Sequence, residues 1–389
     1  MNESIPRSKV GNNSPELIKK RQEFVNKKTG MRLNNISHYT IDTEKLKGNI
    51  ENFIGVAQVP IGIAGPLLVN GKYAQGEFYV PLATTEGTLV ASYNRGMKII
   101  YESGGVTTTI CDDIMQRAPV FIFKNAREAK QFGKWVKENF HEIKKIAEKT
   151  TRFGKLRDIE QYLSNKFLFL RFNYLTGDAG GQNMTTKATF FACEWIRSNY
   201  PHEINHYLLA SNLATDKKAS RINMLRTRGK RVTAEIVIPE FILKNRLKSN
   251  SYVLQRGLQI TTVASFMAGS VSNAYHSTNG ITAMFISTGQ DVANVAESSS
   301  AIMFLEMVNE GDLYCSITIP SLIVATYGGG TGLATQKECL EIMDCYGAGK
   351  VKKLTEIIAA TALAGEISLM AAHYTKEWVS SHENLGRNR

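Results

Sequence analysis

Cysteine is scarce in this sequence, and its spacing excludes two common uses of the residue. The 389 residues include five cysteines, an odd number without any Cys-x-x-Cys pair. A disulfide framework needs paired cysteines in an oxidising compartment, and many zinc sites use closely spaced pairs. We therefore expect reduced thiols in the cytoplasm and no metal site. The cysteines are Cys111, Cys193, Cys315, Cys339 and Cys345.

Long apolar runs are also lacking. Two segments, residues 257–290 and 313–336, contain no Asp, Glu, Lys or Arg, but Gly, Ser and Thr interrupt both of them. Neither segment offers the roughly 20 consecutive apolar residues that a transmembrane helix needs. The N-terminus is polar and does not resemble a signal peptide. We expect a cytoplasmic protein without a membrane partner.

Acidic residues are outnumbered by basic residues, 35 to 47, which gives a formal net charge of +12. This excess favours an anionic partner: nucleic acid, a membrane surface or a phosphorylated ligand. Hydrophobic residues make up 43% of the chain and charged residues 21%. These are ordinary values for a folded protein, and the chain is long enough for two domains.

The densest basic segment spans residues 215–231 and contains seven basic residues and one acid. Ile222, Met224 and Leu225 interrupt the charges and are expected to be buried, and Gly229 allows a backbone to approach a ligand closely. A solvated loop is the alternative interpretation, but we favour a site for a polyanion. The charged residues are Asp216, Lys217, Lys218, Arg221, Arg226, Arg228, Lys230 and Arg231.

The apolar pattern predicts alternating strands and helices between residues 119 and 211, which is typical of a small inserted α+β domain. Helices are expected over residues 14–28, 126–149, 185–198 and 352–379. Strands are expected over residues 73–80, 120–123, 167–175, 232–238 and 281–291, with two more within residues 313–326. Residues 59–66, rich in Pro and Gly, are expected to form a kinked loop.

Two acids occupy positions that are typical of site residues. Apolar residues recur at helical spacing after Thr84 and Thr85, either of which can cap a helix, so Glu86 is expected in the first helical turn. Asp291 ends the expected strand over residues 281–291. The simpler interpretations are a carboxylate beside a helix dipole for the first acid and a helix cap for the second.

Two glycine-rich turns can place backbone N–H groups against a ligand. Residues 177–184 (Gly-Asp-Ala-Gly-Gly-Gln-Asn-Met) lead from an expected strand directly into a helix, an arrangement that suits a phosphate. This segment does not match the Gly-x-Gly-x-x-Gly fingerprint, so a Rossmann fold is not predicted. Residues 327–331 (Tyr-Gly-Gly-Gly-Thr) form the second turn.

From about residue 51 onward, these segments resemble the hydroxymethylglutaryl-CoA reductase (HMG-CoA reductase) family. The Thr-Asp-Lys-Lys and Arg-Gly-Lys sequences resemble class I, the biosynthetic branch, while the membrane anchor of animal and plant members is missing, so a soluble microbial enzyme is implied. The motifs, in family order, are Glu-Asn-Phe-Ile-Gly (51–55), Pro-Leu-Ala-Thr-Thr-Glu-Gly (81–87), the glycine turn (177–184), Thr-Asp-Lys-Lys (215–218), Met-Ala-Gly-Ser (267–270), Gly-Gln-Asp (289–291), Gly-Gly-Gly-Thr (328–331) and Ser-His (381–382).

The resemblance implies an NADPH-dependent oxidoreductase that converts HMG-CoA into mevalonate and CoA by two successive hydride transfers, a step of the mevalonate pathway to isoprenoid precursors. Its four catalytic residues would be Glu86, Lys217, Asp291 and His382. Reduction of a thioester passes through two oxyanions, which a fixed cation such as Lys217 can stabilise. Glu86 would protonate the aldehyde oxygen, Asp291 would hold Lys217, and His382 would protonate the leaving thiolate.

The role of Glu86 as an acid sets a structural requirement. A helix N-terminus and a nearby lysine both favour the carboxylate form of this residue. Burial must therefore raise the pKa of Glu86 if it is to donate a proton. We expect Glu86 to be buried.

Ligand-binding positions are implied by the same resemblance. The basic surplus follows if both ligands are polyanions, and Arg152 favours NADPH over NADH because it suits a 2′-phosphate. The expected substrate residues are Arg117 and Asn212 at the acyl carboxylate, His276 and Asn279 in the pocket, and Ser92, Asn94, Arg95, Lys98 and Lys248 near CoA. The expected cofactor residues are Thr151, Arg152, Phe153, Asp178, Ala179, Gly180, Gly181, Gln182, Asn183, Met184 and Arg387.

The chain departs from the family pattern at two substrate-binding positions. Ala210 replaces a serine that lies two residues before Asn212, and Ile260 and Gln259 occupy the area where many class I members have a lysine. Both departures bear on how the acyl carboxylate is held rather than on hydride transfer. The regulatory phosphoserine of animal members is also missing, because Asn388 aligns with it.

The family architecture implies an α+β fold with a large α/β domain around a long central helix, an inserted small ferredoxin-like α+β domain and a helical N-terminal region. The expected ranges are residues 1–50 for the N-terminal region, 51–118 and 212–389 for the large substrate domain, and 119–211 for the small NADP(H)-binding domain. A homodimer or higher homo-oligomer is implied, with residues 51–55 contributing to the site across the subunit boundary.

Two alternatives stay open from the sequence. The same fold could serve NAD-linked mevalonate oxidation, as in class II enzymes, or reduction of a related acyl-CoA. A protein that binds RNA or membranes would also account for the net charge of +12. The chain lacks the interleaved aromatic residues and motifs typical of nucleic-acid binding, so we expect no nucleic-acid partner.

Overall fold

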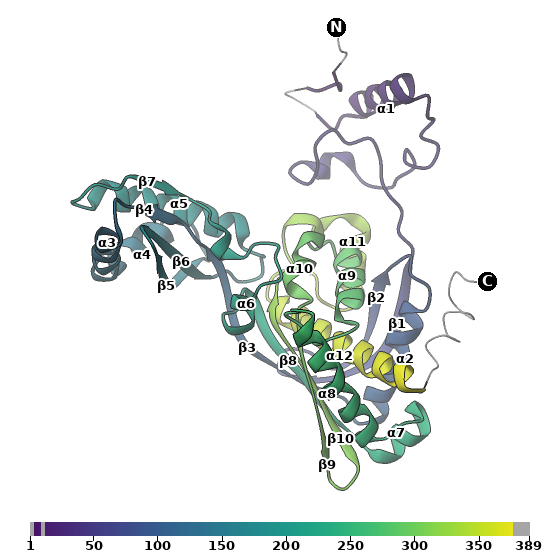
Figure 1. The fold of residues 1–389 in the computed structure, drawn as a ribbon. Coiled ribbons are helices and arrows are strands. Elements are labelled where there is room, and N and C mark those ends of the chain that lie inside the picture. The colour runs from purple at the N-terminus through teal and green to yellow at the C-terminus, as the bar shows by residue number, and fades with distance from the viewer. Residues whose placement is uncertain (1–3, 9–11, 376–389) are drawn as a thin grey trace.

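The computed structural model describes residues 4–8 and 12–375. The N-terminal region projects from the rest of the molecule (Figure 1). It contains α1 (Pro15–Thr29) and the 3-10 turn η1 (Thr43–Leu46). Ser14 caps the start of α1, and Gly30 ends the helix in the left-handed conformation, as expected for these residue types. Ile18, Leu46 and Phe53 form its small hydrophobic cluster.

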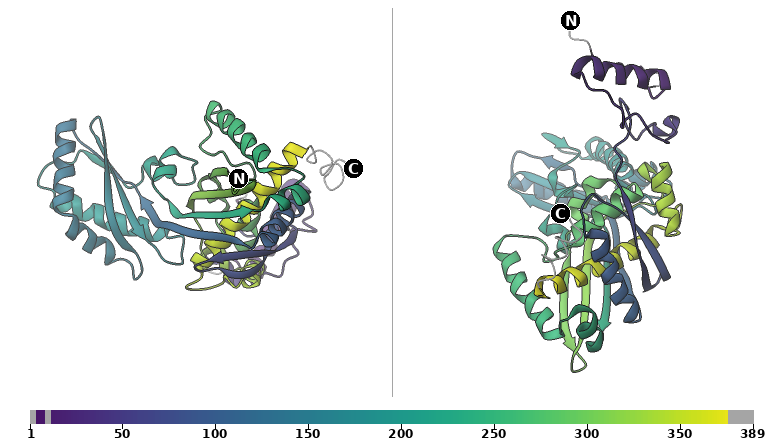
Figure 2. Two further views of the ribbon diagram at one scale, coloured as in Figure 1. Left: turned by 90° about the horizontal axis from the view of Figure 1, so that it is seen from below. Right: turned by 90° about the vertical axis from the view of Figure 1, so that its right-hand side faces the viewer.

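The large body is built on a mixed sheet, and helices pack against it (Figures 1 and 2). β8 pairs with β3 and β10, β10 pairs with β9, and these pairs are antiparallel. β1 pairs antiparallel with β2 and parallel with β3. The strands are β1 (Ile61–Gly71), β2 (Gln75–Ala83), β3 (Val106–Arg117), β8 (Gly229–Ile238), β9 (Ile302–Val308) and β10 (Asp312–Leu322).

The long helix α12 (Val351–Thr375) runs through the core of the large body. It packs against α2 (Leu89–Glu102), α9 (Ser277–Thr288) and the sheet, and its side chains form part of the main hydrophobic cluster. Among the described residues, one helix, Val351–Tyr374, is apolar and long enough to cross a membrane, but 94% of its apolar window is buried inside the protein. α12 is therefore a core helix.

A smaller α+β body contains its own hydrophobic cluster of aromatic and aliphatic side chains. β3 connects the two bodies, because its first part pairs with β8 and its last residues pair with β6. The elements of the small body are β4 (Val120–Ile122), α3 (Ala126–Glu138), α4 (Phe140–Glu148), β5 (Lys155–Ser164), β6 (Phe167–Leu175), α5 (Gln182–Asn199) and β7 (His206–Leu208).

The remaining elements all follow the small body in the sequence. Most of them carry or adjoin residues of the candidate site. They are η2 (Asn212–Ala214), α6 (Arg221–Leu225), α7 (Glu240–Leu247), α8 (Ser251–Met267), η3 (Val292–Asn294), α10 (Val295–Ser298), η4 (Gly329–Gly332) and α11 (Ala334–Ile342).

The predicted α+β fold class is confirmed, and several predicted elements agree closely with the structure. β6 has the predicted bounds, while α1, α5 and β8 lie within a few residues of theirs. The predicted helix over residues 352–379 corresponds to α12, and residues 376–379 lie outside the described residues. The boundaries at residues 50, 118 and 211 remain our proposed division of the chain into domains.

Other predicted elements were wrong. Residues 281–291, predicted as a strand, belong mainly to α9, and residues 59–66 enter β1 instead of forming a loop. The single helix predicted over residues 126–149 is divided at Asn139 into α3 and α4. Residues 313–326 contribute one strand, β10, which continues through Pro320.

Candidate functional site

A cavity of about 680 Å³ lies where the glycine turns approach the end of α9. The first turn contributes residues 179–184, and the second contributes residues 327–331. Asp291 also lines the cavity, and Asn49 from the N-terminal region reaches it by donating a hydrogen bond to the Gly329 carbonyl at 3.1 Å. The two turns singled out in the sequence therefore share one cavity wall.

Lys217 and Asp291 form an ion pair at this cavity. The Lys217 Nζ atom lies 3.0 Å from Asp291 Oδ2, and both side chains are nearly half exposed. The hydrogen bond to Asp291 raises the pKa of Lys217, although partial burial opposes it. Asp291 also caps η3, since its Oδ1 accepts the Ala293 N–H at 3.1 Å. The catalytic and capping interpretations of Asp291 are thus compatible.

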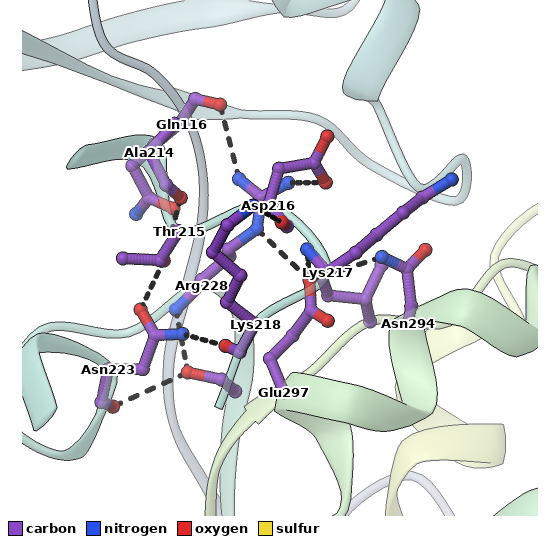
Figure 3. Close-up of polar contacts among 12 residues, drawn as sticks. Gln116, Ala214, Thr215, Asp216, Lys217, Lys218, Asn223, Arg228, Asn294 and Glu297 are labelled. Atoms are coloured by element: carbon purple, nitrogen blue, oxygen red, sulfur yellow. Dashed lines mark hydrogen bonds and ion pairs between the residues drawn. The ribbon is translucent and has the colours of Figure 1, made fainter. Parts of the chain in front are cut away.

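The backbone of Lys217 is held from the protein interior. Its φ of 55° lies in the left-handed region, and its N–H donates to Glu297 Oε1 at 3.0 Å. Glu297 is buried on α10, and in Figure 3 its carboxylate points toward the backbone of Lys217. The same oxygen accepts from Arg228 Nε at 3.3 Å and Asn294 Nδ2 at 3.1 Å. Glu297 was not predicted from the sequence. The one feature that could have indicated it is that Glu297 is the only charged residue between residues 292 and 305.

The basic segment 215–231 differs from the prediction. Arg228 and Lys230 are buried and pair with acids of the protein, so they are not available to an outside polyanion. Leu225, expected to be buried, is 84% exposed. Gly229 has a φ of 83° and packs against the Leu322 carbonyl of β10, so its close approach is to backbone rather than to a ligand.

Glu86 departs from its predicted position. α2 begins at Leu89 with Thr88 as its N-cap, so Glu86 precedes the helix, and the Thr84 hydroxyl accepts the Glu86 N–H at 3.0 Å. The side chain is exposed, contrary to the expected burial. It accepts a long hydrogen bond of 3.5 Å from Asn279 Nδ2. Among the described residues no ion pair joins Glu86 to Lys217.

Asn279 connects Glu86 to a buried histidine. The Asn279 side-chain nitrogen lies 3.2 Å from His276 Nδ1, and Ser92 Oγ lies 3.2 Å from His276 Nε2. Burial lowers the pKa of His276 to about 4, so the imidazole is neutral near pH 7. The backbone N–H of His276 donates to the buried carboxylate of Glu366 at 2.6 Å.

The remaining predicted substrate residues are spread over several elements. Arg117 ends β3 at the junction of the two bodies, where burial lowers the pKa of its guanidinium while nearby Asp216 raises it. Asn212 begins η2 and is exposed. Arg95 donates to Ser368 on α12 at 3.0 Å, and Asn94 accepts the Gly65 N–H at 3.0 Å. Lys98 and Lys248 are exposed.

The predicted cofactor residues surround the start of α5. Gly181 is its N-cap, with a φ of 77° and no side-chain capping bond, and Ala179 to Met184 line the cavity. Asp178 is engaged elsewhere, because its carboxylate accepts the N–H groups of Gly349 at 2.8 Å and Val351 at 3.2 Å. It therefore caps α12.

Residues 151–153 adjoin the same turn. Thr151 Oγ1 contacts Met184 Sδ at 3.0 Å and accepts the Gly154 N–H at 2.9 Å. Arg152 and Phe153 are exposed beside it. Two predicted site residues, His382 and Arg387, lie outside the described residues.

The described part of the site combines a cation, an anion-binding helix start and a network of neutral hydrogen-bonding groups. The Lys217 ammonium can stabilise a developing oxyanion. The uncapped N–H groups of α5 suit a phosphate. This arrangement is consistent with polar chemistry on an anionic substrate beside a phosphorylated cofactor.

Comparison with known proteins identifies the family. The family model for hydroxymethylglutaryl-coenzyme A reductase matches residues 17–387. The 3-hydroxy-3-methylglutaryl-coenzyme A reductase of Pyrococcus abyssi is 45% identical over 375 residues, covering 94% of this chain and 92% of the relative. The enzyme of Methanocaldococcus jannaschii is 43% identical over 376 residues, covering 94% and 92% respectively.

Solved structures support the fold. A class II 3-hydroxy-3-methylglutaryl-CoA reductase from Streptococcus pneumoniae, bound to NADPH in open conformations, superposes with a TM-score of 0.68. The match covers 92% of this chain and 97% of that chain at 20% identity. The family model and the archaeal relatives extend over nearly the whole sequence, and we conclude that this chain belongs to the hydroxymethylglutaryl-coenzyme A reductase family.

Proposed function

We propose that this protein is an NADPH-dependent reductase that converts HMG-CoA into mevalonate and CoA. The reaction consumes two NADPH and two protons, releases CoA as the thiol and supplies isoprenoid precursor synthesis. Membership of the family gives the reaction class. The observation that carries the proposal is the ion pair between Lys217 and Asp291 at the cavity that the glycine turn lines.

The residues around α5 fit a dinucleotide. The helix starts at Gly181 without a side-chain cap, and its first turn contains no acid. Its free N–H groups therefore face the cavity with a favourable dipole for a phosphate. Exposed Arg152 beside this turn supplies a cation for a 2′-phosphate. When bound, the nicotinamide supplies the hydrides.

The protein's own residues would manage charge and protons. The Lys217 ammonium, kept protonated and oriented by Asp291, stabilises the oxyanion that forms when hydride reaches the carbonyl carbon. Glu86, which accepts a hydrogen bond from Asn279, is proposed as the proton donor to the second oxyanion once the bound ligands cover its exposed side chain and supply the burial that this role requires. His382, which lies outside the described residues, is proposed to protonate the CoA thiolate.

Replacement of the cation tests the proposal. We expect Lys217→Ala to lower turnover of HMG-CoA by about 100-fold or more, because an oxyanion partner is lost. The measurement is NADPH oxidation at saturating HMG-CoA. Lys244→Ala is the control, since Lys244 is also exposed and has an acidic partner, Glu240, at 2.8 Å. Near wild-type turnover by Lys217→Ala would contradict the assignment.

Cofactor choice separates the main proposal from NAD-linked mevalonate oxidation. We expect faster reduction with NADPH than with NADH at equal concentration, and Arg152→Glu should raise the KM for NADPH by about tenfold, because one charge-assisted phosphate contact is lost. Its KM for NADH should change little. Equal rates with both cofactors in the wild type would favour the NAD-linked alternative.

The enzyme class is a narrower question than the family. The predicted class I subtype is not confirmed, and the structural neighbour is a class II enzyme. The cofactor comparison does not decide the class, because that class II enzyme is itself bound to NADPH.

We also propose that the protein forms a homodimer. α8 exposes an apolar face on which Val263, Phe266 and Met267 are 60%, 84% and 81% exposed. These residues are spaced three and four apart and share one side of the helix. Contiguous apolar surface of this kind is typical of a protein interface.

A further inference from the structure

The turn that carries Lys217 has an unusual backbone. Thr215 and Lys217 both have positive φ values, 58° and 55°, on either side of Asp216. Neither residue is Gly or Asn, and such a conformation costs of order 1 kcal/mol at each position. The turn therefore needs contacts from the rest of the protein to persist.

Glu297 supplies the contact at Lys217 itself. Its Oε1 atom accepts the Lys217 N–H at 3.0 Å, while its side chain is completely buried. Because it is buried, Glu297 is not positioned to touch a ligand in the cavity. Any effect it has on chemistry must pass through Lys217.

Arg228 holds the same turn from a second position. Its guanidinium is completely buried and bonds Asp216 Oδ1 at 2.7 Å, Glu297 Oε1 at 3.3 Å and the Gln116 carbonyl at 3.2 Å. It thus bridges the residue before Lys217 and the acid behind it (Figure 3). Removal of Arg228 would leave the buried Glu297 without a charged partner, which is strongly unfavourable.

The network also reaches the glycine turn. Gln182, the first residue of α5, donates to Asn294 Oδ1 at 2.9 Å, and Asn294 donates to Glu297 Oε1 at 3.1 Å. A continuous path of hydrogen bonds therefore runs from the proposed dinucleotide site to the Lys217 N–H.

We propose that Glu297 is a positioning residue, which fixes the backbone of Lys217 and thereby aims its ammonium at the reacting oxygen. The kinetic consequence rests on the proposed function, whereas the structural consequence does not. Displacement of a catalytic group by about 1 Å can lower a rate by about 100-fold, so the effect should be on kcat rather than on substrate binding.

The kinetic test compares two changes at Glu297 with a matched control. Glu297→Ala removes the acceptor and should lower kcat by about 100-fold with KM changed less than about threefold. Glu297→Gln keeps an oxygen that can accept the Lys217 N–H, so its kcat should be at least about tenfold higher than that of Glu297→Ala. Glu356→Gln is the control, because Glu356 is equally buried and also accepts backbone N–H groups, those of Tyr73 and Ala74.

A second measurement works without substrate. Hydrogen exchange of the Lys217 amide should be at least about tenfold faster in Glu297→Ala than in the wild type and unchanged in Glu356→Gln. If Glu297→Ala does not fold, Glu297→Gln is compared with the wild type instead. Its kcat should fall by less than is expected for Glu297→Ala, and its Lys217 amide should exchange measurably faster than in the wild type.

The outcomes distinguish the two proposals. A wild-type protein that does not reduce HMG-CoA overturns the proposed function, while hydrogen exchange still decides the role of Glu297. Unchanged exchange at Lys217, or a kcat loss no larger than that of Glu356→Gln, overturns the positioning role. A rise in KM with kcat unchanged also overturns it.

Discussion

Lys217 and Asp291 contribute chemistry more than stability. Both side chains are nearly half exposed, and ion pairs in such positions are worth roughly 0–1 kcal/mol. The pair instead fixes where a positive charge lies and raises the pKa of Lys217. The free-energy cost of burying charged groups arises instead at Arg228 and Glu297, which support the turn from the protein interior.

The residue types of the site could be predicted from the sequence, but their surroundings could not. The resemblance selected Lys217 and Asp291, which the structure brings to 3.0 Å. It gave no indication that Glu86 is exposed, because exposure depends on which element covers the residue. Glu297 was missed because its partners are a backbone N–H and a distant arginine, neither of which leaves a local pattern.

His276 should make stability depend on pH. Burial lowers its pKa to about 4 from 6.5, so the unfolded chain binds a proton that the folded protein does not. Its contribution is therefore complete above pH 6.5 and is lost as the pH falls toward 4. Between pH 7 and pH 5 the wild type should lose roughly 2 kcal/mol more unfolding free energy than His276→Gln.

Urea denaturation at the two pH values measures this difference. His202→Gln is a control, since His202 is exposed. Equal losses in the wild type and in His276→Gln would show that His276 is not responsible.

At the scale of elements, β6 has the predicted bounds although it is mostly buried, and α5 lies within a few residues of its predicted bounds. α9 was predicted as a strand because a short apolar run that is buried on all sides has no distinctive period. β3, β5 and β9 were not predicted. The residues of β3 and β5 are half polar, and β3 pairs with the distant strand β8. β5 and β9 instead pair with the next strand along the chain, β6 and β10.

The contact between α2 and α12 depends on Gly96. A Cβ atom at this position would overlap the Ala364 carbonyl of α12, and backbone cannot move aside easily. We expect Gly96→Ala to lower the unfolding free energy by about 3 kcal/mol, as overpacked cores do. This loss would exceed the gain of about 1 kcal/mol from better helix propensity.

Ala91→Gly on the exposed face of the same helix is the matched control. It should cost about 1 kcal/mol through propensity alone. Chemical denaturation of both variants measures the two effects, and a Gly96→Ala protein as stable as the wild type would mean that the helices can separate without penalty.

At the scale of the whole molecule, the chain builds separate hydrophobic clusters that β3 connects. The composition predicted room for more than one core, but it did not predict that one strand would belong to both bodies. The sequence also could not show which basic residues are buried and which are accessible to a ligand. Arg228 and Lys230 are buried and form internal ion pairs, while Lys217 and Arg152 are exposed.

The apolar face of α8 gives a prediction for assembly. Phe266→Glu should convert a dimer into monomers, because a buried unpaired charge opposes association. Light scattering on a size-exclusion column measures the mass of both species. Lys134→Glu on the exposed surface of α3 is the control. If Phe266→Glu keeps the mass of the wild type, the face of α8 is not the interface.

The position of α12 in the sequence has a consequence for biosynthesis. The strands and helices that it holds together are all complete by residue 342, yet the helix itself begins only at Val351. During translation the large body therefore cannot complete its core until α12 has been synthesised. The small body, whose last strand ends at Leu208, can fold much earlier. A nascent chain halted before residue 351 should consequently be a good substrate for chaperones.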